Sequence, residues 1–445
     1  MANGNKRIGG ALAAAACGLL GAGAPERSNA ADPSRSSDNG QWDVDSAFLY
    51  YGESDGRVKD ASITAIAVRD FGDDHKLSLD AGFDTLTGAS PSGAIASDLP
   101  QTFTSPSGRS TYTTPAGKVP LDSSFHDTRF ALNGTWSQPL ARLYTVSAGL
   151  GLSTEYDYRH LGVNAGLTRD FNQRNTTTSL SLGYSQDSVN PIGGVPVAFS
   201  AMTDAVNEEG VPGNRAGSSQ DKKVLDVLFG VTQVLGRHSL LRLNYSYSDS
   251  TGYLTDPYKI LSVVDPVSGE PVTRTPPPGT EGPGGIYLFE HRPDARARQS
   301  LYGELRQDFS GKVLSLGYRY STDDWQVNSH TLEARLHWPL GSGYFEPHLR
   351  YYTQTAASFY RYSLADGAAL PEFASADARL ADLDTYTVGL KYARPVEGGN
   401  EWSARIELYH QVSKAPAATL IGPPSNVLMP DFDAVILQFG YHFSL

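Results

Sequence analysis

Along much of the chain, apolar residues occupy every second position and polar or small residues lie between them. The pattern is clearest where Leu241, Leu243, Tyr245 and Tyr247 alternate with Arg242, Asn244, Ser246 and Ser248. A period of two predicts β-strands with one apolar and one polar face. About nine to eleven such residues are enough for one strand of a membrane-spanning barrel.

Sixteen segments of the chain show this alternation. We predict strands at 41–53, 58–71, 76–88, 127–137, 142–156, 158–171, 175–188, 222–235, 239–252, 297–309, 312–323, 328–338, 343–356, 380–392, 400–412 and 432–445. Periodicity alone leaves two fold classes open, because a soluble β-sandwich alternates in the same way with its apolar face turned inward.

The lengths of the connections favour the barrel. Every second connection is a short turn, starting with 72–75, whereas all the long connections fall in the other set, at 89–126, 189–221, 253–296, 357–379 and 413–431. Outer-membrane barrels have short periplasmic turns and long external loops, and a sandwich has no reason to sort its loops in this way. The predicted fold class is therefore all-β, a transmembrane antiparallel up-and-down β-barrel of about 16 strands.

The first 30 residues have the features of a secretory signal peptide. Lys6 and Arg7 precede an apolar run over 8–24, and Ser28 and Ala30 are small residues at the expected cleavage site. We expect a signal peptide at 1–30 and an outer-membrane barrel at 31–445. A first transmembrane helix and a lipoprotein acylated at Cys17 are the alternatives.

Composition excludes several classes of function. The chain carries 36 Lys and Arg against 48 Asp and Glu, a net charge of −12, and has no basic tract, so no nucleic-acid partner is expected. After cleavage no cysteine remains, which excludes disulfides and thiolate chemistry. Catalytic and metal motifs such as GxSxG and HExxH are absent, and His348 is expected to face the lumen alone. We expect no enzyme activity, no cofactor and no metal.

Charged residues on the polar face gather in the later strands. If the apolar face meets lipid, strands ten to fifteen turn a charged wall toward the lumen, for which we name Glu304, Arg306, Arg319, Glu333, Arg335, Glu346, Arg350, Arg405 and Glu407. Strands one to nine offer fewer charges. Because such charges require water or mutual pairing, the charged wall is either a constriction that selects small polar solutes or a structural network of ion pairs.

The last predicted strand ends in a pattern that resembles the signal read by the outer-membrane barrel-assembly machinery. Its residues are Gln438, Gly440, Phe443 and Leu445, that is, a polar residue, a glycine, an aromatic residue and an apolar end. The resemblance implies that this machinery and outer-membrane lipid are partners of the chain.

Eight segments across the mature chain resemble a proteobacterial family catalogued as a domain of unknown function. They are WDVDSAFLYYGES (42–54), RDFGDDHKLSL (69–79), DTLTGASPSGA (84–94), PQTFTSPSG (100–108), FHDTRFAL (125–132), RDFNQRNTT (169–177), NPIGGVPV (190–197) and YRYSTDDWQVNSHTLEARLHWPL (318–340). The resemblance implies an outer-membrane barrel with no established substrate. Family members are often encoded beside thioredoxin-like and flavin-transferring proteins, which implies periplasmic redox proteins as partners.

Together these observations predict a porin-like channel in the cell outer membrane for the passage of small polar solutes. The alternative function is a non-conducting barrel that serves as a docking or assembly partner for the periplasmic redox proteins. Bilayer conductance of the purified protein distinguishes the two.

Overall fold

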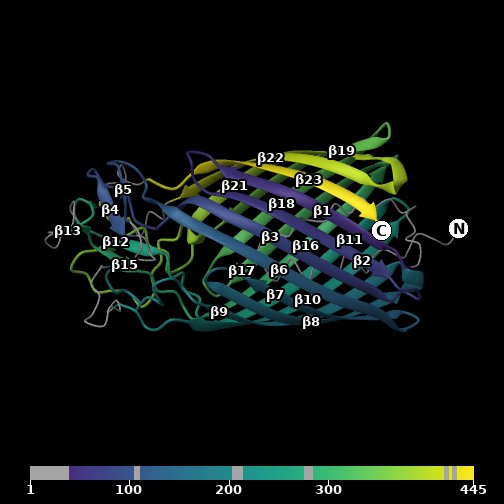
Figure 1. Ribbon diagram of the computed structural model, residues 1–445, viewed down its shortest axis with the longest axis horizontal. Helices are drawn as coiled ribbons and strands as arrows, with labels where there is room; N and C mark the ends of the chain where they lie inside the picture. The colour runs from purple at the N-terminus through teal and green to yellow at the C-terminus, as the bar shows by residue number, and fades with distance from the viewer. Residues whose placement is uncertain (1–39, 105–110, 203–213, 275–283, 415–419, 423–427) are drawn as a thin grey trace.

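Sixteen strands of the chain close into one barrel (Figure 1). The structure, a computed structural model, describes residues 40–104, 111–202, 214–274, 284–414, 420–422 and 428–445. The expected signal peptide at 1–30, with Cys17, lies outside the described residues. The barrel strands are β1 (Trp42–Glu53), β2 (Lys59–Asp70), β3 (Lys76–Pro91), β6 (Leu121–Ala141), β7 (Tyr144–Thr154), β8 (Tyr158–Phe171), β9 (Thr176–Val189), β10 (Gln220–Gly236), β11 (Ser239–Gly252), β16 (Ala295–Phe309), β17 (Lys312–Asp323), β18 (Asn328–Leu340), β19 (Gly343–Gln354), β21 (Asp382–Pro395), β22 (Glu401–Lys414) and β23 (Phe432–Ser444).

The barrel is antiparallel throughout, and each strand pairs with its neighbours in the sequence. The last strand, β23, pairs with β1 in a register that runs from Asp43↔Ser444 to Glu53↔Ala434. Trp42 and Leu445 exchange backbone hydrogen bonds of 2.9 and 2.8 Å at the end of this pair. The predicted up-and-down barrel of 16 strands is confirmed, and closure leaves no strand edge exposed.

All the long connections lie at one end of the barrel, which we call the long-loop end. At the other end, the short-turn end, β2, β6, β8, β10, β16, β18 and β21 each turn into the next strand within a few residues. Two of these turns contain short 3-10 helices, η1 (Asn172–Arg174) and η3 (Glu397–Gly399). Among the described residues, no helix is long and apolar enough to cross a membrane.

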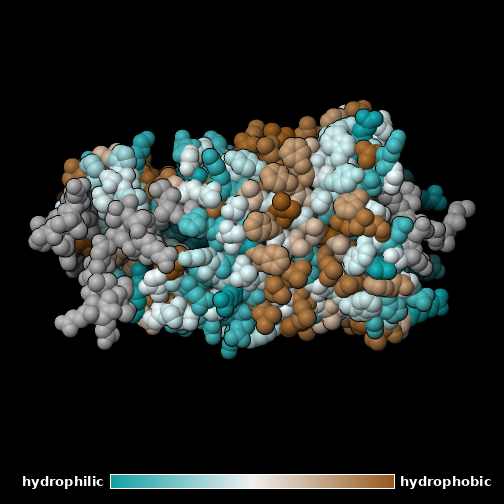
Figure 2. All heavy atoms as spheres, in the orientation of Figure 1, coloured by the Kyte–Doolittle hydropathy of each residue, from teal (hydrophilic) through white to brown (hydrophobic). Residues whose placement is uncertain are grey.

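The barrel turns its apolar side chains outward. On β8, Leu161 and Val163 are 62% and 46% exposed, whereas Gly162 between them is buried. On the face of the wall seen in Figure 2, apolar side chains gather in a band, with hydrophilic side chains toward both ends of the barrel. This polarity is the reverse of that of a soluble protein and suits a wall surrounded by acyl chains.

The long connections fold into a cap over the long-loop end (Figure 1). We define the cap as the described parts of 92–120, 190–219, 253–294, 324–327 and 355–381. Sequence analysis predicted loops here, but the cap contains seven short strands, β4 (Gln101–Thr104), β5 (Thr111–Thr114), β12 (Ile260–Val264), β13 (Thr273–Arg274), β14 (Gly284–Gly285), β15 (Tyr287–Phe289) and β20 (Leu364–Ala365). The largest cap sheet has the order β15-β12-β20 and joins two different connections.

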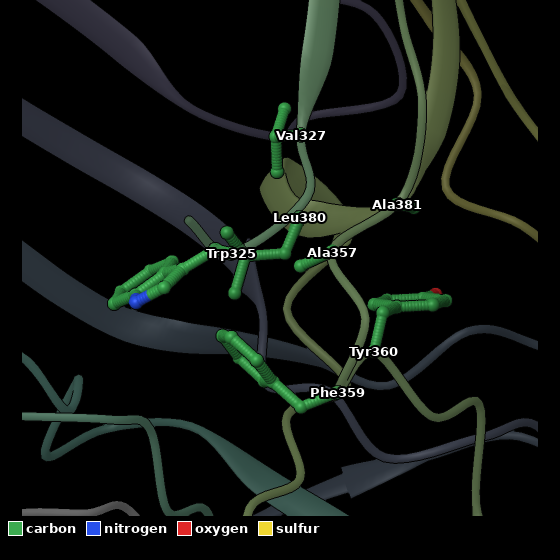
Figure 3. Packing of buried hydrophobic residues seen from close by; sticks show 7 residues of the cluster. All are labelled: Trp325, Val327, Ala357, Phe359, Tyr360, Leu380 and Ala381. Carbon is green, nitrogen blue, oxygen red and sulfur yellow. The ribbon is translucent and has the colours of Figure 1, made fainter. Parts of the chain in front are cut away.

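The four clusters of buried apolar side chains lie in the cap. In the cluster of Figure 3, Trp325 packs edge-on against Phe359 with 5.0 Å between ring centroids, and Leu380 of the 3-10 helix η2 (Ala378–Leu380) is buried beside them. Elsewhere Phe103, Ile260 and Phe289 are each 1% exposed. The cap therefore has a conventional hydrophobic core of its own, which ties together connections from distant strands.

One predicted boundary is wrong by several residues. The fourth barrel strand was predicted at 127–137, but β6 runs from Leu121 to Ala141 and pairs with β3 as far as Pro91. The register shifts between Gly88 and Ser90. Gly88 has φ +125°, and a Cβ there would lie 2.4 Å from the Arg57 carbonyl oxygen, so only glycine fits this irregularity.

Candidate functional site

The lumen of the barrel is lined by polar and charged side chains from alternate positions of each strand. On β16, Ser300 and Glu304 are 8% and 6% exposed, whereas Leu301 and Leu305 are 56% and 38% exposed. Because successive strand residues point to opposite faces, the buried polar set faces the lumen and the exposed apolar set faces outward. The period of two therefore places the charged wall in the interior.

Part of the charged wall is an ion-pair group centred on Glu304. The Glu304 carboxylate lies 2.6 Å from Nε of Arg306 and 3.2 Å from Nη1 of Arg242 on the neighbouring strand β11. Arg242 and Glu304 are opposite each other in the β11–β16 register. Two arginines therefore neutralise one buried carboxylate, which is the condition under which a charge can remain ionised away from bulk water.

A second ion-pair group is centred on His348 of β19. Its Nδ1 lies 2.9 Å from Glu407 Oε1 on β22, and its Nε2 lies 3.3 Å from Glu333 Oε1 on β18. Sequence analysis expected His348 to stand alone in the lumen. That expectation is wrong, because the carboxylates come from strands that lie up to two positions away around the barrel.

A glycine makes the contact between His348 of β19 and Glu407 of β22 possible, although β21 lies between the two strands. In the register, His348 is opposite Gly389 of β21, and Gly389 is opposite Glu407 of β22. A Cβ on Gly389 would lie 2.8 Å from Cγ of Glu407. The missing side chain lets Glu407 pass over β21 to reach His348. Arginines complete the group, with Arg335 at 2.5 Å from Glu333 and Arg405 at 3.2 Å from Glu407 and 3.5 Å from Glu346.

The structure therefore divides the nine residues of the charged wall into two sets. Seven of them take part in these ion pairs, namely Glu304, Arg306, Glu333, Arg335, Glu346, Arg405 and Glu407. Arg319 and Arg350 have exposed side chains, and within the part of the chain that the structure describes no carboxylate oxygen lies within 4 Å of either guanidinium. Ion pairing thus explains how the seven paired residues are tolerated inside the barrel, but it does not explain Arg319 and Arg350.

Strands β8 to β10 carry a charged cluster that sequence analysis did not single out. Asp187 of β9 is 2% exposed, and its carboxylate lies 2.7 Å from Nδ1 of His160 and 3.2 Å from Nζ of Lys222. The Tyr158 hydroxyl donates a hydrogen bond to the same carboxylate. Charged side chains therefore face the lumen from the earlier strands as well, where sequence analysis expected few of them. Alternation places each residue inside, but the register that brings them together could not be derived from the sequence.

A cavity of about 870 Å³ lies between the long-loop end of the barrel and the cap. Three carboxylates line it on the barrel side, from Asp127 near the end of β6 and from Glu155 and Asp157 in the β7–β8 turn. One oxygen from each lies within 4.8 Å of the others, so the three could supply oxygen ligands to a hard cation such as calcium. The Tyr258 hydroxyl of the cap donates a hydrogen bond to Asp157.

The surroundings raise the pKa of two of these carboxyl groups, Glu155 and Asp157. Burial, and then the neighbouring charge of Asp127, raises the pKa of Glu155 to about 7. Burial also raises the pKa of Asp157, although the hydrogen bond from Tyr258 opposes the shift. A sequence signal for this group is weak, because Asp127 and the Glu155 turn are far apart in the chain and meet only through the β6–β7 register.

Charged residues also tie two connections of the cap together. Glu290 accepts a hydrogen bond of 2.5 Å from Ser375 and one of 2.7 Å from the Asp256 backbone N–H, and its carboxylate lies 2.6 Å from Nε of Arg292. Arg292 in turn lies 2.8 Å from Asp377. We call these five residues the cap latch, since they join 253–294 to 355–381.

Burial raises the pKa of Glu290 to about 7, because the low polarity of its surroundings outweighs the charge of Arg292. For Asp377, burial acts in the same sense, but the charges of Arg379, Lys259 and Arg292 hold its pKa below the usual range. The latch thus contains one carboxyl group that titrates near neutral pH, Glu290, and two that stay ionised, Asp377 and Asp256.

Comparison with known proteins identifies a family and a general likeness to outer-membrane proteins. Residues 9–443 match the family described as protein of unknown function DUF3570. No curated protein matches the chain.

Among solved structures, the siderophore receptor PirA from Acinetobacter baumannii is 9% identical with a TM-score of 0.41, and the match covers 85% of this chain and 54% of that chain. A bacterial polysaccharide outer membrane secretin is 9% identical with a TM-score of 0.42, covering 92% and 100% of the two chains. The outer membrane protein OpdK from Pseudomonas aeruginosa is 10% identical with a TM-score of 0.36, covering 92% and 99%. The chain spans about half the length of the siderophore receptor that it matches.

Proposed function

Because the chain belongs to the family of proteins of unknown function DUF3570, we propose a function from its geometry. We propose that the protein is an outer-membrane barrel that lets small polar solutes pass through its lumen, and that the cap controls entry at the external mouth. The long-loop end faces outward and the short-turn end faces the periplasm, as in other barrels of this topology.

A single observation carries the proposal, namely the reversed polarity of the barrel wall. Large apolar side chains point outward, with Leu150 65% exposed and Phe439 56% exposed, while Glu304 and His348 inside the barrel are each 6% exposed. Only a closed barrel or a helix satisfies every backbone group within lipid. The exposed apolar belt supports placement in a membrane, and the charged interior supports a wet lumen.

The number of strands agrees with passage of solutes. Barrels of 16 to 18 strands leave room for an aqueous channel, whereas eight strands are filled by side chains. The cap cavity of about 870 Å³ adds space for a small solute directly above the lumen. The exposed side chains of Arg319 and Arg350 inside the barrel support a wet lumen.

The cap itself favours the second candidate, a non-conducting barrel that serves as a docking or assembly partner for periplasmic redox proteins. Its apolar clusters join connections from opposite parts of the barrel and cover the long-loop end. If the cap never opens, the barrel conducts nothing, and its short-turn end remains as the surface available to periplasmic partners.

Conductance of the purified protein in planar lipid bilayers tests the proposal. We expect discrete current steps, and larger steps from a variant in which 256–290 is replaced by a short Gly-Ser linker, since this removes β12 and two residues of the cap latch, Asp256 and Glu290. The same preparation after heat denaturation is the control for contaminating channels. A bilayer that stays sealed with both proteins would reject the channel and favour the docking role.

A further inference from the structure

Three arginines in the lumen differ from all those of the ion-pair groups. They are Arg298 of β16, Arg319 of β17 and Arg350 of β19, which we call the arginine trio. All three side chains are exposed, although they point into the barrel. Among the described residues, none of the three has a carboxylate oxygen within 4 Å, whereas Arg242, Arg306, Arg335 and Arg405 all do.

The strand registers bring the arginine trio to one region of the lumen. Arg319 is opposite Thr331 of β18, which is opposite Tyr352 of β19, two residues from Arg350. Arg298 lies on β16, the neighbour of β17 in the barrel, four residues nearer the long-loop end than the residue opposite Arg319. Each arginine lies within a few residues of the long-loop end of its strand, so the region lies close beneath the cap.

Neighbouring groups orient the Arg319 side chain without an ion pair. The Arg319 guanidinium lies over the Tyr302 ring at 4.9 Å from its centroid and donates a hydrogen bond of 3.5 Å to the Ser300 hydroxyl. Ring contacts of this kind orient a guanidinium and leave its charge available to a ligand.

Three like charges in one region repel one another, and an anion placed between them would relieve this repulsion. A guanidinium presents parallel N–H groups whose spacing matches the oxygens of a carboxylate or a phosphate. We propose that the arginine trio forms a binding site for the carboxylate or phosphate group of a small solute. The proposal deepens the channel function by naming the class of solute, but binding to this site does not require conduction.

Isothermal titration calorimetry on the full chain in detergent tests the site with sodium succinate and sodium phosphate as probes and sodium chloride at equal ionic strength as the reference. We expect saturable binding of at least one probe to the wild type. We expect at least tenfold weaker binding to the triple variant Arg298→Gln, Arg319→Gln, Arg350→Gln. Arg394→Gln removes the same charge from the exposed β21 residue near the short-turn end and is the matched control, with binding unchanged.

Heat modifiability on denaturing gels checks that each variant is folded. If the triple variant does not fold, the single variant Arg350→Gln is compared with Arg350→Lys, and we expect the glutamine to weaken binding more than the lysine. Absence of saturable binding to the wild type, or equal binding to the folded variants, would overturn the proposal. Binding that is lost only in the trio variants while bilayers stay sealed would uphold the site and reject the channel.

Discussion

At the scale of single residues, a buried charge is tolerated in this fold when it has a partner of opposite charge. In the barrel, Glu407 meets both His348 and Arg405, and in the cap Glu290 meets Arg292. Removing one member of such a pair typically costs about 3–5 kcal/mol, because the remaining charge stays buried without a partner. The arginine trio departs from this rule, which is why we assign it to a ligand.

The cap latch predicts a pH dependence. The pKa of Glu290 is raised from 4.5 to about 7, so its contribution to cap stability is fully present below pH 4.5 and is lost as the pH rises through 7. Since one pKa unit corresponds to about 1.4 kcal/mol, the loss is about 3 kcal/mol. The charged neighbours Asp256, Asp377 and Arg292 stay ionised across this range. Glu155 in the adjoining cavity changes stability in the same direction.

Hydrogen exchange of cap peptides, corrected for the intrinsic effect of pH, measures this. We expect the wild-type cap to be less protected at pH 8 than at pH 5 and Glu290→Gln to reduce the difference. Glu372→Gln changes an exposed carboxyl group of the same connection and should behave like the wild type. A wild-type cap that gained protection between pH 5 and pH 8 would contradict the assignment.

For a single residue, the sequence predicts whether its side chain faces the lumen or the outside, but it does not predict which residue it pairs with. The period of two correctly indicates that Glu304, Glu333 and Glu407 share one face of their strands. That Glu407 reaches His348 depends on the register of three strands and on Gly389 between them. Register is set by pairing over whole strands, and no local pattern around residue 348 contains that information.

At the scale of elements, each barrel strand is built by the same alternation. The predicted segments agree with the barrel strands to within a few residues, apart from β6, because each strand must cross the same thickness with one apolar face. The short cap strands could not be predicted in this way. For example, β12 pairs with β15 and β20, which lie in two different parts of the sequence, and a strand of two to five residues has no measurable period.

Two neighbouring residues in the middle of β8 should therefore differ strongly in how much stability they lose on the same substitution. Val163 is 46% exposed on the outer face, and Asn164 faces the lumen. We expect Val163→Arg to lower the free energy of unfolding by about 2–4 kcal/mol, the usual cost of an arginine at the lipid midplane. We expect Asn164→Arg to have a much smaller effect. Urea titration in lipid vesicles measures both, and equal losses would mean that the β8 outer face does not meet lipid.

At the scale of the whole molecule, two parts of opposite polarity lie end to end. The barrel has charges inside and apolar groups outside, whereas the cap has an apolar core that contains Phe103 and Phe289. The barrel could be predicted because its pattern repeats sixteen times. The cap could not, because its core consists of contacts between connections that lie far apart in the sequence and meet at one end of the barrel. The same division holds for the candidate site, since the alternation of residues indicates which side chains face the lumen, whereas nothing in it indicates the cap cavity.

If solutes enter by separation of the cap connections, a disulfide across them should close the channel. Ala201 and Leu288 form an antiparallel bridge between 190–219 and 253–294, flanked by hydrogen bonds from Met202 to Tyr287 and from Phe289 to Ser200. Residues in such a position have Cα atoms close enough for a disulfide. The chain has one other cysteine, Cys17, which is changed to serine in all variants.

We expect the oxidised double variant Ala201→Cys, Leu288→Cys to give smaller or fewer current steps than the wild type, and a reducing agent to restore them. Each single cysteine variant, treated with the same oxidant, is the control for effects of the thiol itself. Unchanged current in the fully oxidised double variant would mean that solutes bypass the cap.

The pairing of the first and last strands has a further consequence for how the protein is made. Since β1 and β23 join as completely as any other neighbours, the finished ring has no structural beginning. A circularly permuted gene could start at a different turn, such as the one after Gly236, and still encode the same wall. In that chain Phe443 and Leu445 would no longer be terminal, so permutation separates the shape of the ring from the terminal pattern that we expect the barrel-assembly machinery to read.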